Sequence, residues 1–191
     1  MITSMKKTLL LLIACFAVLT MQAQTGHLKF MGIPLDGPIE RFHQKMLVKG
    51  CRVNREDEFR GLLPPGSRSY TGTFVGKRAN IIVFYNESDK IVYGAKAYFD
   101  RLTEAASEEE YNRVKTLLQT KYPDVETVEE AEGELKYLTL MPSNGTIMVY
   151  QKKSRNYADA SSPYSLHIEY TDETNDKTNE KSPKGNALDD L

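Results

Sequence analysis

Two segments with helical spacing are each followed by a run of strand-like segments, and this order constrains the fold more than any other feature of the chain. The first helix is predicted over about 37–49, and the second from Ser107 to the residue before Pro123. Short strands that follow a helix without a crossover helix between them pair as antiparallel neighbours. The sequence therefore predicts an α+β fold, in which one antiparallel sheet carries two helices on one face as a tandem α-β-β-β-β repeat.

Both helices are marked by an apolar stripe and by signals at their ends. In the first, Ile39, Phe42 and Met46 recur at helical spacing, and Gly50 can end the helix in a left-handed conformation. In the second, Ser107 and Glu110 have the spacing of a capping box. The residues expected to face the sheet from the second helix are Tyr111, Val114, Leu117, Leu118 and Tyr122.

The strands are predicted where β-branched and aromatic residues lie between turn signals. The predicted strands are 27–33, 70–75, 80–85, 91–99, 135–141, 146–152 and 164–171. Asn144-Gly145 is a strong hairpin-turn signal between two of them. The repeat divides the folded region into halves at 27–100 and 101–171. We therefore expect a single α+β domain over 24–171.

The first 23 residues have the order of a secretory signal peptide. Lys6 and Lys7 precede an apolar run over 9–19, and Ala23 is a small residue at a plausible cleavage position. The run is shorter than the ~20 residues that a membrane-spanning helix needs. We therefore expect a periplasmic or secreted protein without a membrane span. The alternative is a lipoprotein, because residues 12–15 fit the pattern before a lipid-modified cysteine, here Cys15.

The last 20 residues, 172–191, are expected to form a disordered charged tail, because they contain few apolar residues to bury. The whole chain has 25 Lys and Arg against 26 Asp and Glu, which gives a formal net charge of −1. A balanced charge disfavours a nucleic-acid partner, since such surfaces usually carry a basic excess.

The leader and the segment HLKFMGIPLDGPIERFHQKMLVKG after it resemble small uncharacterised exported proteins of the Bacteroidetes. Phe30, Gly32, Ile33, Pro34, Asp36 and Gly37 carry the resemblance. It implies an envelope or secreted location and no known activity. The tandem plan of helix and strands also looks like the architecture of the β-lactamase inhibitor proteins. That second likeness is one of topology, and it transfers no functional residue.

Motifs for catalysis, metal binding and cofactor binding are missing from the sequence. His27, His43 and His167 lack the spacing of a zinc site, and the chain contains no phosphate-binding loop and no nucleophile elbow. Cys51 and His43 are the pair that a thiol-dependent enzyme could use, although a free cysteine is more often a packed core residue. We assign no catalytic residue, metal or cofactor.

Alternation along the central strands points to one candidate binding surface. Lys96 and Tyr98 are out of phase with apolar neighbours on one strand, as are His167 and Glu169 on another, so the pleat turns all four away from the helices. We therefore expect a non-catalytic envelope module that binds a protein, peptide or glycan through an open sheet face. The alternative is a hydrolase or thiol-dependent enzyme with an unrecognised active site. The oligomeric state is left open.

Overall fold

The computed structural model describes residues 26–61, 63–153 and 161–176. The predicted leader, with cleavage at Ala23 and the alternative modification of Cys15, lies outside the described residues, as does the predicted tail from residue 177 on. The helices are α2 (Ile39–Val48), α3 (Arg55–Phe59) and α4 (Glu104–Lys121). The strands are β1 (Lys29–Phe30), β2 (Ile33–Pro34), β3 (Arg52–Val53), β4 (Ser67–Phe74), β5 (Lys77–Tyr85), β6 (Val92–Leu102), β7 (Thr127–Glu132), β8 (Leu135–Leu140), β9 (Gly145–Lys153) and β10 (Tyr164–Asp172).

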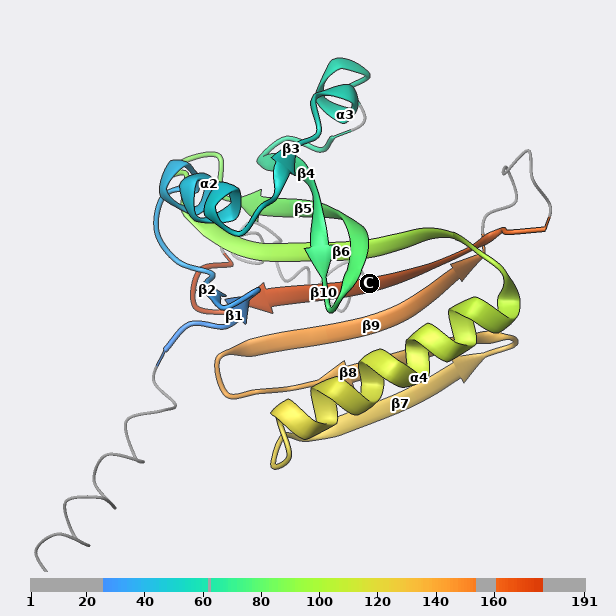
Figure 1. Cartoon of the computed structure of the whole chain (residues 1–191). Coiled ribbons are helices and arrows are strands. Elements are labelled where there is room, and N and C mark those ends of the chain that lie inside the picture. The colour runs from blue at the N-terminus through green and yellow to red at the C-terminus, as the bar shows by residue number, and fades with distance from the viewer. Residues whose placement is uncertain (1–25, 62, 154–160, 177–191) are drawn as a thin grey trace, which may run out of the picture.

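The predicted α+β class is confirmed, and so is the order of its elements. Eight strands form one antiparallel sheet in the order β3-β4-β5-β6-β10-β9-β8-β7, and β1 and β2 form a small separate sheet. Each half has a main helix followed by four sheet strands, since α2 precedes β3 to β6 and α4 precedes β7 to β10; the first half also contains the short helix α3 between β3 and β4. The last strands of the two halves, β6 and β10, pair at the centre of the sheet (Figure 1).

One face of the sheet forms the core together with the helices. A row of directly paired residues crosses six strands, and all of them are almost fully buried: Tyr70, Ile81, Ala97, Ile168, Val149 and Leu138. Helix α4 lies across β10, β9 and β6 on this face (Figure 1). Helix α2 reaches the same row, where His43 Nδ1 lies 3.1 Å from Tyr70 Oη. Both helices therefore cover one face, and the other is free of helices α2 and α4.

Helix α4 begins earlier than predicted, and Ser107 is not its cap. Thr103 is the N-cap, and its Oγ1 accepts a hydrogen bond from the backbone N–H of Ala106 at 3.2 Å. Ser107 is fully buried one turn inside the helix, where Gln151 Nε2 donates to its hydroxyl at 3.0 Å. A serine three positions before a glutamate can cap a helix only if its hydroxyl is available to the helix backbone. Here the Ser107 hydroxyl is hydrogen-bonded by Gln151 of strand β9 instead.

One local prediction fails because a turn intervenes. The predicted strand at 27–33 is a short hairpin, β1 and β2, turned by Met31 and Gly32 with φ of 53° and 78°. Residues 55–58 lie in helix α3. The glutamates at 129, 130 and 132 lie in strand β7, which pairs with β8 along its whole length.

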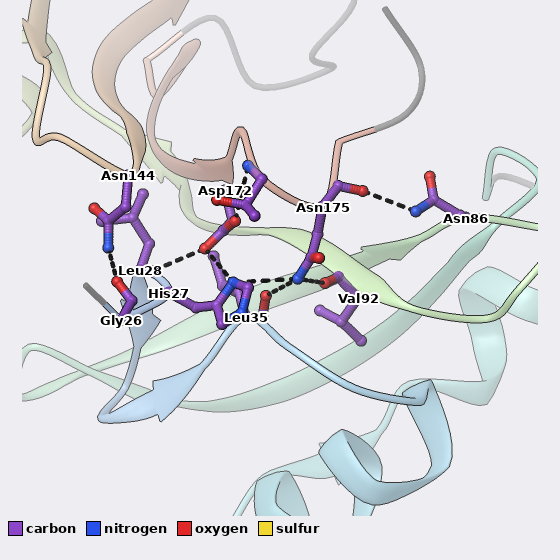
Figure 2. Close-up of polar contacts among 10 residues, drawn as sticks. Gly26, His27, Leu28, Leu35, Asn86, Val92, Asn144, Asp172 and Asn175 are labelled. Carbon is purple, nitrogen blue, oxygen red and sulfur yellow. Dashed lines mark hydrogen bonds and ion pairs between the residues drawn. The ribbon is translucent and has the colours of Figure 1, made fainter. Parts of the chain in front are cut away.

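A polar cluster joins the two ends of the described chain (Figure 2). Asp172 is fully buried, and its Oδ2 accepts from the backbone N–H of Leu28 at 2.8 Å and lies 3.1 Å from His27 Nδ1. Asn175 Nδ2 donates to the carbonyl oxygen of Leu35 at 2.9 Å, and its own carbonyl oxygen accepts from Asn86 at 2.8 Å. The domain boundary predicted after residue 171 therefore cuts through contacts that continue to residue 175.

Candidate binding face

The structure brings the four predicted binding residues together on two neighbouring strands. His167 of β10 pairs directly with Tyr98 of β6, and Glu169 pairs with Lys96. They alternate along their strands with Ala97 and other residues of the buried row, so their side chains lie on the sheet face opposite the helices. We call this surface the open face.

His167 is packed between two aromatic rings rather than displayed. Its ring centroid lies 5.3 Å from that of Tyr98 and 5.0 Å from that of Tyr150, with interplanar angles of 11° and 5°. Only 9% of His167 is exposed, whereas the sequence predicted an exposed side chain. His167 is buried because large rings at directly opposite positions on three adjacent strands stand side by side, and the two outer rings cover the middle one.

This packing keeps His167 uncharged. Burial between the rings, together with the nearby positive charges of Lys152 and Lys96, lowers the pKa of His167 to about 3. Nε2 lies 2.9 Å from Ser165 Oγ, while Nδ1 is buried and makes no hydrogen bond within the described part of the chain. General acid–base work near neutral pH needs a group whose pKa lies close to the working pH. His167 is therefore unsuited to that role.

Tyr150 is a member of the open face that the sequence reasoning missed. Its hydroxyl donates a hydrogen bond to Glu169 Oε2 at 3.0 Å. Burial and the Glu169 carboxylate both raise the pKa of Tyr150. The signal was present, since Ile147 and Val149 alternate with Tyr150 as the residues of β10 alternate with His167. What the sequence lacked was the strand order that sets Tyr150 beside His167.

Next to this aromatic row lies a row of mixed character. Ile82, Lys96, Glu169 and Met148 follow one another across β5, β6, β10 and β9. Met148 is 39% exposed, and the Lys96 ammonium lies 5.7 Å from the centre of the Phe84 ring. The open face thus offers apolar and aromatic area with both signs of charge at hand.

Cys51 and His43 do not form a catalytic pair. Burial raises the pKa of the Cys51 thiol, so the thiolate that a nucleophile requires is disfavoured. The sulfur packs against Gly72, where an added Cβ would lie 2.6 Å from Sγ. The His43 ring is engaged by Tyr70 instead. This arrangement is that of a structural thiol.

The acidic residues near β7 are used in ion pairs. Glu129 pairs with Lys115, and Glu134 pairs with Lys153 at 2.6 Å. Over residues 26–61, 63–153 and 161–176, no group of three or more His, Cys, Asp or Glu side chains is placed to hold a metal ion. In the same ranges, no helix has both the length and the apolar character to cross a bilayer.

Comparison with protein-family models, with curated proteins and with solved structures finds no match to this chain.

Proposed function

We propose that this protein is an exported, non-catalytic binding module that recognises a protein partner through the open face. The observation that carries the proposal is the aromatic row Tyr98–His167–Tyr150 beside the exposed side chain of Met148. Aromatic residues and methionine are enriched at protein interfaces, because they bury much area at a modest cost in conformational entropy. Export is proposed from the leader-like sequence at residues 1–23.

The ring geometry favours a protein or peptide over a glycan. Sugars bind aromatic residues by lying flat on an exposed ring face, but both faces of the His167 ring are covered. The remaining face of Tyr150 is approached by the Lys152 ammonium at 5.4 Å. At His167 and Tyr150 the row therefore presents ring edges, which suit the apolar side chains of a protein surface better than the flat face of a sugar ring.

Site-specific photocrosslinking tests this proposal. A benzophenone amino acid at position 148 on the open face should give a discrete adduct in intact cells. The same residue at position 119, exposed on α4, is the matched control and should give none. The proposal is wrong if both positions crosslink alike or if position 148 gives no adduct.

The partner identified in this way should then be measured with purified proteins. Tyr98→Ala should weaken its binding by about 1–3 kcal/mol, the range expected for an aromatic anchor. Met148→Arg should also weaken binding, and because Met148 is partly exposed, it should leave the melting temperature nearly unchanged. Unchanged affinity in both variants, measured by titration calorimetry, would contradict the assigned surface.

A further inference from the structure

The second feature that points to a ligand is a cavity on the helix-covered side of the molecule, separate from the open face. Its volume is about 420 Å³, within the range of small-molecule sites. Ile168 and Tyr170 of β10 form its floor, and α4 forms one wall. The opposite wall is the tip of the β4–β5 hairpin, which lies on the same face of the sheet as α4 (Figure 1).

The lining of the cavity combines apolar side chains with polar groups. Phe74, Val75, Val114 and Leu117 contribute aliphatic and aromatic surface, and Leu117 is 45% exposed. Lys49 and Lys121 are the charged side chains of this lining, which contains no carboxylate. Neither lysine has an ion-pair partner among the described residues. Both lysines are exposed, and the Lys121 ammonium lies 4.9 Å from the centre of the Tyr122 ring. A cavity with apolar walls and two such ammonium groups is complementary to an apolar molecule that carries one anionic group.

Two hairpin turns border the cavity. Met31 and Val75 line it and have φ of 53° and 43°, and each is followed by a glycine of positive φ, as a two-residue hairpin turn requires. Arg113 Nη1 donates to the carbonyl oxygen of Val75 at 2.9 Å, and Arg113 is itself bound to the buried Glu110. These bonds attach the tip of the β4–β5 hairpin to α4 beside the cavity.

We propose that this cavity binds a medium-chain fatty acid, with the hydrocarbon chain against the apolar walls and the carboxylate held by Lys49 and Lys121. The proposal concerns a different face from the open face, so either can fail without the other. A free fatty acid fits better than an apolar peptide side chain, because the two lysines can pair with a negative charge on the occupant.

The absence of tryptophan from the sequence gives a clean test. Leu117→Trp places an indole in the cavity wall at a position that is already partly exposed. Decanoate, added below its critical micelle concentration, should shift the emission of this indole in a saturable way. Met148→Trp on the open face is the matched control and should not respond. An unresponsive indole at position 117, or an equal response at both positions, would overturn the proposal.

The role of the lysines is tested in the Leu117→Trp background. Lys49→Gln with Lys121→Gln should weaken decanoate binding roughly tenfold or more, since both charge-assisted contacts are lost. Lys29→Gln with Lys90→Gln removes two exposed lysines outside the cavity lining and should leave the affinity unchanged. The Leu117→Trp protein with both lysines intact should bind decanol about tenfold or more weakly than decanoate. It should not bind butyrate. Equal affinity for decanoate and decanol, or no effect of the Lys49 and Lys121 changes, would show that the carboxylate is not recognised and would refute the proposal.

Discussion

His167 illustrates how a single residue can satisfy an alternation pattern and still behave unlike the expectation drawn from it. Its side chain lies on the face that the pattern predicts, but Tyr98 and Tyr150 cover it. The pKa of His167 in the folded protein is about 3, below the ordinary value of 6.5. Between these values the unfolded chain binds a proton that the folded chain does not. The contribution of His167 to stability is therefore complete above pH 6.5 and is lost as the pH falls toward 3.

Replacement of this histidine by a ring that cannot be protonated should remove that pH dependence. His167→Phe keeps an aromatic ring between Tyr98 and Tyr150 and eliminates the buried Nδ1 that lacks a partner. Between pH 7 and pH 4.5, wild type should lose roughly 2–3 kcal/mol more stability than His167→Phe, at about 1.4 kcal/mol per pH unit. Urea unfolding of both proteins at the two pH values measures this difference. Parallel losses in the two proteins would mean that His167 titrates normally in the fold.

At the scale of elements, α4 is attached to the β4–β5 hairpin through one buried carboxylate. Glu110 is 1% exposed and pairs with Lys77 of β5 and with Arg113, while Arg113 also binds the hairpin at Val75. Burial raises the pKa of Glu110, but hydrogen bonds from Arg113 and Lys77 lower it by more, so it lies below the ordinary value. The ionised form is thus the one that stabilises the fold, and its contribution is lost as acid protonates it.

Removal of this charge should loosen the contact between α4 and the hairpin. Glu110→Gln should lower the free energy of unfolding by about 1–3 kcal/mol at pH 7, because the buried position no longer pairs with two cations. The loss should shrink on acidification, as Glu110 of the wild type becomes protonated. Glu109→Gln, one position away and exposed, is the matched control and should change stability by less than about 0.5 kcal/mol. Equal effects of the two substitutions in urea unfolding would show that Glu110 does not link these elements.

At the scale of the whole molecule, the two ends of the folded region hold each other in place. Asp172 satisfies the backbone N–H of Leu28, 144 positions away in sequence, and Asn175 satisfies the carbonyl oxygen of Leu35 (Figure 2). These hydrogen bonds attach the residues at the end of strand β10 to the residues that flank the hairpin of β1 and β2. We call this attachment the closure. The residues immediately after 171 therefore belong to the fold in a physical sense, although their composition resembles that of the charged segment after them.

Loss of this closure should be measurable in global stability. Asp172→Ala should lower the free energy of unfolding by about 1–3 kcal/mol, since the buried N–H of Leu28 loses its acceptor. A chain that ends at residue 171 should be destabilised at least as much, and a chain that ends at 176 should match the full-length protein. Glu173→Ala changes the exposed neighbour and serves as the control. Equal melting temperatures for the chains ending at 171 and 176 would show that the closure contributes nothing.

The sequence by itself determined the elements whose signals are local. Helical spacing in 39–48, the left-handed end at Gly50 and the alternation along β9 and β10 all depend on neighbours within one segment, and the structure contains them. The fold class followed from their order. Only the tertiary structure decided the roles of Ser107, Glu129 and Asp172, because each is engaged by a residue that is distant in sequence.

The open face and the cavity also differ in how far the sequence predicts them. Alternation was sufficient to place Lys96, Tyr98, His167 and Glu169 on one face, because the pleat has a period of two whatever the neighbours are. The stacking of His167 between Tyr98 and Tyr150 needed the strand order and the register, which set β10 between β6 of the first half and β9 of its own half. The cavity beside α4 left no pattern in the sequence, since its lining comes from five separate segments of the chain that meet only in the folded molecule.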